Sequence, residues 1–336
     1  MNKRIFSIIG CQHEHISIFI EEMLDMGHQC IGIYENENMR LANEISHKYD
    51  IPLVSSIPLL LGEEVDVVGC ASINNEKIDV IELCEKHGIS VMLDKPAVTN
   101  TRDLNRLHAV MQRGNIQIGM LLTERYRPTL CSLKQRIIDG VYGEIVHISM
   151  RKPHMLKPAS RPSWHFSKEQ SGGIIIDLFV HDFDLLRWLT SQDIISALGF
   201  MSKRILPEYP DFFDASGLQV LLEGGVSAQL YADWHTPESC WTYGDGRIFV
   251  VGTEGTAELR LAGDPLSIDA GLSEILLEMT RQQSWKQVIS APISKTITND
   301  FLARIDGQEI GITHKDIFAT TKATLDADET AIQVIR

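Results

Sequence analysis

Residues 4–34 read RIFSIIGCQHEHISIFIEEMLDMGHQCIGIY, and the order of patterns in this stretch decides the fold class. Ile5–Ile9 is a short run rich in β-branched residues, and Gly10 ends it. Apolar residues then recur at helical spacing over Ile16–Met26, and Cys30–Tyr34 again resembles a strand. A strand, a helix and a second strand within about 30 residues predict the first unit of a parallel sheet.

The same alternation continues to residue 122. Helices are expected at Met39–Tyr49, Lys77–Lys86 and Asp103–Arg113, and strands at Val65–Cys70, Val91–Leu93 and Ile116–Leu122. Strands that alternate with helices predict an α/β fold with a Rossmann-like, doubly wound parallel sheet. We therefore expect residues 1–122 to form one domain.

The pattern changes in residues 123–336, which we expect to form a second, α+β domain. Several strands follow one another there without helices between them, which predicts a largely antiparallel sheet. The expected elements are the strands Glu144–Met150, Gly217–Leu222, Val226–Trp234, Ile248–Gly252 and Ala257–Leu261, a loop over residues 152–171 and a helix Ile174–Leu189. A last outer helix, His314–Ile335, is expected to fold back, with the first domain as one place where it could pack. Because few helices cover the outer sheet face, we expect a homo-oligomer, either a dimer or a tetramer.

The composition narrows the classes of partner. The 336 residues contain 31 Lys and Arg against 45 Asp and Glu, which gives a formal net charge of −14. This charge argues against nucleic acid and acidic membrane surfaces and favours a small-molecule ligand. No apolar run approaches the roughly 18 residues of a membrane helix. The six cysteines form no CxxC pair, so a reduced, cytoplasmic protein is expected.

The turn Gly10–His15 is the first candidate for a binding site. A dinucleotide fingerprint reads G-x-G-x-x-G, and only its first glycine is present here, with Gln12 and His15 at the other two places. The following helix still offers a positive dipole end to a phosphate, and Gln12, His13 or His15 could add side-chain donors. The alternative is a Rossmann fold that has lost its cofactor.

Glu35 follows the second expected strand directly and is the second candidate. An acidic residue at this place binds the ribose hydroxyls of NAD and repels the 2′-phosphate of NADP. The sequence therefore predicts NAD, with NADP less favoured. The alternative is a solvated acidic turn, since Glu37 lies two residues further on.

Two further motifs could supply catalytic groups. Asp94-Lys95-Pro96 ends an expected strand, at the sheet edge where ligands bind in open α/β folds. In the segment 172–184 (GGIIIDLFVHDFD), Asp177 and His181 are four residues apart and share a helix face, with Asp184 one turn further on. An Asp beside a His can support it as a general base. Each residue also has a purely structural interpretation. Lys95 could be a surface lysine at a strand end, Asp177 a carboxylate in the first turn of a helix, and His181 a buried core histidine.

Together these motifs resemble the glucose–fructose oxidoreductase/inositol dehydrogenase (Gfo/Idh/MocA) family. The residues that carry the resemblance are Gly10, Glu35, Asn74, Asp94-Lys95-Pro96 and the segment 172–184, with further similarity at 137–145, 252–259 and 299–302. The resemblance implies an N-terminal NAD(P)-binding domain, a C-terminal domain with a large open sheet, and activity on sugars or polyols. It also assigns catalytic roles to Lys95, Asp177 and His181. Two residues depart from the family pattern, namely Asp94 in place of Glu and Lys77 in place of His.

The resulting hypothesis is an NAD(P)-dependent oxidoreductase acting on a sugar- or polyol-like alcohol or ketone. His181 would take the hydroxyl proton, Lys95 would hold the same oxygen, and Asp177 would fix the histidine tautomer. The expected cofactor contacts are Gly10, Cys11, Gln12, His13, Glu35, Ser72, Asn74, Asp94 and Lys95, and the expected substrate contacts are Arg125, Lys152, Trp164, His165 and Tyr243. No metal is expected.

Two other classes of function remain open from the sequence. One is a non-catalytic regulator that senses NAD or a sugar on the same fold. The other, less favoured, is a metal-dependent enzyme that uses Asp177, His181 and Asp184, because carboxylates and imidazoles are ordinary metal ligands.

Overall fold

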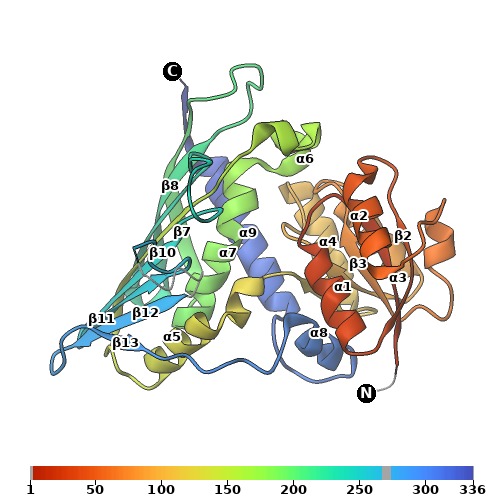
Figure 1. Cartoon of the computed structure of the whole chain (residues 1–336). Coiled ribbons are helices and arrows are strands. Elements are labelled where there is room, and N and C mark those ends of the chain that lie inside the picture. The colour runs from red at the N-terminus through yellow and green to blue at the C-terminus, as the bar shows by residue number, and fades with distance from the viewer. Residues whose placement is uncertain (1–2, 267–273, 336) are drawn as a thin grey trace. The chain divides into compact units, whose positions relative to one another are not determined.

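The computed structural model describes residues 3–266 and 274–335, which belong to two units (Figure 1). Unit 1 comprises residues 1–122, 162–172 and 295–322, and unit 2 comprises residues 123–161, 173–294 and 323–336. The expected division placed 162–172 and 295–322 in the second domain, whereas their contacts group them with unit 1.

Unit 1 is built on a five-stranded parallel sheet in the order β2-β1-β3-β4-β5. Its strands are β1 (Ile5–Cys11), β2 (Gln29–Tyr34), β3 (Val67–Ala71), β4 (Ser90–Leu93) and β5 (Ile118–Met120). Its helices are α1 (Ile16–Asp25), α2 (Met39–Tyr49), η1 (Ile57–Leu60), α3 (Lys77–Lys86), α4 (Thr101–Arg113), η4 (Ser163–Phe166), α6 (Lys168–Ser171) and α8 (Ile297–Ile305). All five residues of β3 are buried, as expected of a central strand with both faces covered. The predicted Rossmann-like sheet is confirmed.

The two late segments of unit 1 are held to it by specific hydrogen bonds. The Thr298 amide at the start of α8 donates to Glu22 of α1 at 3.0 Å. The Ile118 amide of β5 donates to His314 Nε2 at 2.9 Å, and Arg304 donates to the Ile118 carbonyl at 3.3 Å. No local sequence pattern indicates these pairings, because the partners are between 186 and 276 residues apart.

Unit 2 is built on a nine-stranded sheet in the order β13-β12-β11-β10-β6-β9-β8-β7-β14. Its strands are β6 (Ile145–Pro153), β7 (Ile194–Lys203), β8 (Ala215–Leu222), β9 (Ser227–Asp233), β10 (Arg247–Gly252), β11 (Gly255–Arg260), β12 (Ile275–Thr280), β13 (Lys286–Val288) and β14 (Ile332–Ile335). Its helical elements are η2 (Thr123–Tyr126), α5 (Pro128–Ile138), η3 (Pro158–Ser160), α7 (Gly173–Thr190) and η5 (Glu223–Gly225). The pairs β6–β9 and β7–β14 are parallel and the others antiparallel, which confirms the mainly antiparallel sheet.

Three predictions about this half of the chain need correction. The last helix, α9 (His314–Thr330), ends five residues before Ile335, because the chain continues as β14 and pairs with β7. Residues 152–171 are not a plain loop, since they include the end of β6 and three short helices. Strands β7, β12 and β13 were not expected, although β7 forms the longest ladder of the sheet together with β8.

One face of the unit 2 sheet carries α7, whose residues pack on β9, β6, β7 and β8 (Figure 1). The alternation along the strands leaves large apolar side chains on the other face. Leu198 of β7 is 61% exposed, and Phe200, Leu221, Phe249 and Val251 are also exposed. Within the described residues, no helix has the length and apolar character needed to cross a membrane.

Candidate functional site

A pocket of about 320 Å³ lies at the carboxyl ends of β1, β2 and β3 in unit 1. Its lining residues come from the ends of these strands and the turns that follow them, namely Ile9, Gly10 and Gln12 at β1, Tyr34 and Glu35 at β2, and Ser72 and Ile73 at β3. In a sheet of order 2-1-3-4-5 the strand order reverses between β1 and β3, and this is where such folds bind ligands. The volume suits a small molecule.

Gly10 lets the first turn approach the third strand closely. It has φ +78°, and a Cβ atom there would lie 2.2 Å from Ser72 Oγ and 2.4 Å from the Ser72 amide nitrogen. A side chain is therefore excluded both by conformation and by space. The predicted binding residues Gly10 and Ser72 are side by side in the pocket wall.

The Glu35 carboxylate is fixed by backbone amides. Its Oε2 accepts from the Cys11 amide at 2.6 Å, and its Oε1 accepts from the Asn36 and Glu37 amides at 2.9 and 2.8 Å. The Cys11 side chain points into the core, where burial and the charge of Glu35 raise the pKa of its thiol to about 12. Cys11 therefore contributes its backbone, not its sulfur, to the turn beside the pocket.

The pocket wall is acidic beyond Glu35. Glu37, Glu76 and Asp79 also line it. Burial and the charges of Glu37 and Glu35 raise the pKa of Glu76 above its usual range. A ligand with a further anionic group at this wall would meet like charges, whereas hydroxyl groups would find acceptors. A parallel sheet with an acidic pocket at its switch point is the arrangement of dinucleotide-binding proteins.

Gln12 provides a test of whether such a ligand fits. Its side chain is only 9% exposed, and its Oε1 accepts from the Trp164 indole N–H at 3.0 Å. Its Nε2 is buried and has no hydrogen-bond partner. A buried amide with two unused donors in a pocket wall fits a ligand that brings acceptor oxygens. The phosphate and ribose oxygens of a dinucleotide have this chemistry.

Asp94 is a buried residue whose carboxylate lies close to a lysine and two histidines. Its Oδ1 lies 3.0 Å from His15 Nδ1, and its Oδ2 lies 3.5 Å from His13 Nδ1 and 3.7 Å from Lys77 Nζ. Burial alone would raise the pKa of Asp94, but His13, Lys77 and the hydrogen bond with His15 hold it well below the usual range. The predicted residues His13 and Asp94 are thus brought together.

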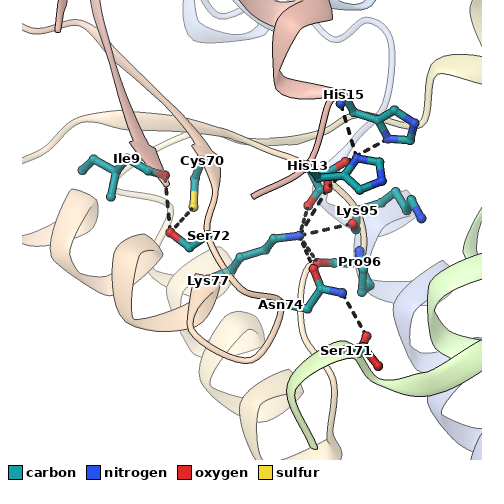
Figure 2. Close-up of polar contacts among 11 residues, drawn as sticks. Ile9, His13, His15, Cys70, Ser72, Asn74, Lys77, Lys95, Pro96 and Ser171 are labelled. Atoms are coloured by element: carbon teal, nitrogen blue, oxygen red, sulfur yellow. Dashed lines mark hydrogen bonds and ion pairs between the residues drawn. The ribbon is translucent and has the colours of Figure 1, made fainter. Parts of the chain in front are cut away.

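Lys77 is the centre of this arrangement and was noted from the sequence only as a departure from the family pattern. Its side chain is fully buried, and its ammonium donates to Asn74 Oδ1 at 2.8 Å and to the carbonyls of Asp94, Lys95 and Pro96 at 2.9, 3.2 and 3.1 Å. Figure 2 shows the Lys95 side chain extending away from this cluster. Lys77 therefore holds the backbone that carries Lys95, in a turn with a cis Lys95–Pro96 peptide bond.

Asn74 serves the same local network rather than the pocket wall. Its Oδ1 accepts from Lys77, and its Nδ2 donates to the Ser171 carbonyl at 2.9 Å. Both ends of the amide are thus occupied within unit 1. A direct cofactor contact of Asn74 stays a prediction.

His13, His15 and Asp94 are also the one group of three possible metal ligands close enough together among the described residues. The neighbouring ammonium of Lys77 already compensates the Asp94 charge. The set Asp177, His181 and Asp184, considered from the sequence, is not such a group. Asp184 instead accepts two hydrogen bonds from Arg125, at 2.8 and 2.5 Å, in a buried ion pair.

Helix α7 of unit 2 presents Asp177 and His181 on one stripe. Gly173, Asp177 and His181 are half-buried, whereas all other residues from 174 to 187 are buried. Their spacing of four places them one above the other on the helix. The predicted shared face of Asp177 and His181 therefore agrees with the burial pattern, while Lys95 belongs to unit 1.

The five predicted substrate contacts fall in different surroundings. In unit 2, Lys152 is buried and pairs with Glu124 and, at 2.6 Å, with Asp182. The exposed Tyr243 pairs through its hydroxyl with Arg161. In unit 1, Trp164 donates to Gln12, and His165 is buried beside it. Arg125 and Lys152 thus have internal ion-pair partners, and a substrate contact by any of the five stays a prediction.

The buried group around Lys152 was missed by the sequence analysis. Burial and the nearby charge of Glu124 raise the pKa of Asp182 to about 6, although Lys152 opposes this. Glu124 behaves in the opposite way, because Lys152 and His181 overcome its burial and lower its pKa to about 2. One cation therefore faces two carboxylates of unequal acidity. No sequence signal links the three residues, which come from η2, β6 and α7.

Comparison with known proteins identifies the family. An NAD-binding Rossmann-fold model of the oxidoreductase family GFO_IDH_MocA matches residues 6–120, and the GFO/IDH/MocA C-terminal domain matches residues 131–258. Together they cover more than half of the 336 residues. The chain belongs to the GFO/IDH/MocA oxidoreductase family, as its motifs predicted.

Curated relatives match part of their length. The chain is 27% identical to the rhizopine catabolism protein MocA of Rhizobium meliloti over 206 residues, which are 60% of this chain and 61% of that protein. It is also 27% identical to inositol 2-dehydrogenase 2 of Saccharopolyspora erythraea over 166 residues, 48% of this chain and 46% of that protein. The chain thus spans about half to three fifths of these relatives.

Solved structures match over nearly the whole chain. A protein from Erwinia carotovora atroseptica has a TM-score of 0.89 at 22% identity, covering 99% of this chain and 100% of that one. Levoglucosan dehydrogenase in complex with NADH has a TM-score of 0.82 at 17% identity, covering 98% and 97%. At these identities the similarity shows the fold.

Proposed function

We propose that this protein is an NAD-dependent dehydrogenase or reductase of sugar- or polyol-like compounds. The observation that carries the proposal is the acidic pocket at the switch point of the unit 1 sheet, with Glu35 fixed after β2 and the Nε2 group of Gln12 buried without a hydrogen-bond partner. Family membership supports redox chemistry, and relatives named as inositol dehydrogenases support the substrate class.

NAD rather than NADP is proposed because of charge. Glu35, Glu37, Glu76 and Asp79 line the pocket, and among the residues that the structure describes no Lys or Arg lines it. A 2′-phosphate would add a dianion to this wall, whereas the ribose hydroxyls can donate to its carboxylates. When bound, the nicotinamide would accept or deliver the hydride.

The protein's own groups would handle the proton and the developing charge. His181 takes the hydroxyl proton as general base, and Asp177, four residues earlier on α7, orients its imidazole. Lys95 holds the reacting oxygen and stabilises its negative charge. Lys77 and Asp94 keep the turn that carries Lys95 in place.

The remaining parts of the proposal concern the state of the protein. A homo-oligomer is supported by the exposed apolar side chains of the unit 2 sheet, which a second copy would bury. A cytoplasmic location is supported by six cysteines that form no disulfide.

A screen of sugars and polyols with NAD⁺ and NADP⁺, followed by absorbance of the reduced nicotinamide, tests the activity. Turnover of at least one polyol or sugar with NAD⁺ is expected. Binding of neither nucleotide, measured by calorimetry, would overturn the proposal irrespective of the substrates tried.

A further inference from the structure

The first turn of unit 1 lacks the second and third fingerprint glycines. Several backbone amides of the usual anion site already donate to carbonyls of the protein. In the fingerprint, free amides at the helix N-terminus hold the pyrophosphate. Here the amides of Ile16, Ser17 and Ile18 donate to the carbonyls of residues 13, 14 and 15, at 3.3, 3.0 and 3.0 Å. A bound pyrophosphate would therefore gain from further donors, which a side chain of the turn can supply.

Gln12 stands at the place of the second glycine and carries such donors. Its backbone is fixed by the Gln12 amide, which donates to the Ala71 carbonyl at 2.8 Å. Its Nε2 is buried, unpartnered and part of a residue that lines the pocket. Two hydrogen bonds left unmade in a buried amide are costly, so an acceptor from a ligand is expected there.

Trp164 fixes which end of the amide faces the ligand. The indole N–H can only donate, so the atom that it contacts at 3.0 Å must be the amide oxygen. The NH₂ group is then the end left over. The orientation of this amide follows from the chemistry of its partner, and rotation would place two donors against each other.

We propose that Gln12 donates to the pyrophosphate of the bound dinucleotide in place of a backbone amide, and that Trp164 is the positioning residue that orients it. This inference rests on the proposed function and deepens it. It changes the role expected of Trp164 from a substrate contact to a group that acts through Gln12. The segment 162–172 thereby contributes to the cofactor site of unit 1.

The test measures by calorimetry how tightly the protein binds NADH and two fragments of it, ADP-ribose and adenosine, and it requires no turnover. Gln12→Met keeps the length of the side chain but removes its polar atoms, and should weaken NADH about tenfold or more, as expected for loss of a hydrogen bond to a charged group. Gln12→Glu keeps the acceptor for Trp164 and places a carboxylate at the phosphate, so it should bind NADH more weakly than Gln12→Met. Trp164→Phe keeps an aromatic ring, and should weaken NADH severalfold.

The fragments locate the effect. ADP-ribose, which has the pyrophosphate, should lose affinity in the Gln12 variants as NADH does, whereas adenosine should bind each variant as it binds the wild type. Combining Trp164→Phe with Gln12→Met should cost no more than Gln12→Met alone, because Trp164 acts only through Gln12. Gln29→Met, a matched change at an exposed position of β2, should leave NADH binding unchanged.

The two levels of the proposal fail in different ways. If the wild type binds neither NADH nor ADP-ribose, the proposed function is wrong. If the wild type binds both and the Gln12 and Trp164 variants bind equally tightly, only the role of these residues is wrong. Equal losses for adenosine and ADP-ribose would likewise overturn the contact with the pyrophosphate.

Discussion

The ammonium group of Lys77 lies 3.7 Å from the Asp94 carboxylate in unit 1, and both side chains are almost completely excluded from solvent. The ammonium has three protons and four oxygen acceptors within hydrogen-bonding distance, at Asn74, Asp94, Lys95 and Pro96. Its burial is thus compensated by both charge and hydrogen bonds.

Removal of this ammonium should destabilise the protein strongly. Lys77→Met leaves the Asp94 carboxylate with the two histidines alone, and breaking a buried pair typically costs about 3–5 kcal/mol. Lys48→Met is a matched control, because Lys48 pairs with Glu21 at 2.8 Å on the surface, where solvent screens the pair, and its loss should change the stability little. Urea unfolding of both variants measures the difference. Similar losses in the two would show that the buried pair does not stabilise unit 1.

Asp182 should make stability fall as the pH rises. Its pKa is raised from 3.8 to about 6, so the folded state holds this proton more tightly than the unfolded state between these values. Stability linked to Asp182 is therefore present below about pH 4 and is lost as the pH rises through about 6.

The Asp182→Asn variant isolates this contribution. The free energy of unfolding of this variant minus that of the wild type should be higher at pH 8 than at pH 5 by roughly 1–1.5 kcal/mol. The reason is that pH 5 lies about one unit below the raised pKa, and one unit corresponds to about 1.4 kcal/mol. Denaturant unfolding at the two pH values gives the comparison. A stability difference that is the same at both would contradict the raised pKa.

Lys95→Met should nearly abolish turnover while NADH binding and the melting temperature change little. The loss of a group that stabilises the reacting oxygen typically costs about 2.7–4 kcal/mol, or roughly a hundred- to thousandfold in kcat. His181→Ala should lose roughly a hundredfold or more through the missing base. If both act on one oxygen, the double variant should lose less than the product of the two.

The control for this prediction is Lys86→Met, an exposed lysine at the end of α3. It should keep the wild-type kcat. Steady-state kinetics on the first substrate found and a thermal melt of each variant separate catalysis from folding. Wild-type kcat in Lys95→Met would remove Lys95 from the mechanism.

NADH should bind at least about tenfold more tightly than NADPH, because like charges brought together cost several kcal/mol. Glu76→Gln removes one of the four carboxylates of the pocket wall and should reduce the ratio of the affinities for NADH and NADPH. Calorimetry with both nucleotides measures it. Tighter binding of NADPH by the wild type would overturn the role given to Glu35.

The exposed face of the unit 2 sheet should hold copies of the protein together. Light scattering at micromolar concentration should give the molar mass of a dimer or a tetramer. Leu198→Glu in β7 should lower this mass toward that of a smaller assembly. Leu59→Glu is the matched control, because Leu59 is 59% exposed but belongs to unit 1. A monomer mass for the wild type would exclude the assembly.

The sequence predicted those features that a local pattern encodes. The parallel sheet follows from alternating strands and helices, and Glu35 and the Asp177–His181 spacing follow from short motifs. Features that depend on distant pairing were not predictable. Arg125 and Asp184 are 59 residues apart, and nothing in either neighbourhood announces that they form an ion pair. The short strand β14 likewise exists because β7 offers it a hydrogen-bonding edge.

The three-part composition of unit 1 has a consequence for synthesis on the ribosome. Residues 1–122 emerge first, but α8 and the start of α9 complete the unit only when residue 322 has been made. At roughly 5–20 residues per second, the intervening 322 − 122 = 200 residues take about 10–40 s. During this interval α1 lacks Thr298 as a partner for Glu22, and β5 lacks His314 as an acceptor for the Ile118 amide. Residues 1–122 are therefore among the last parts of the molecule to reach their final form.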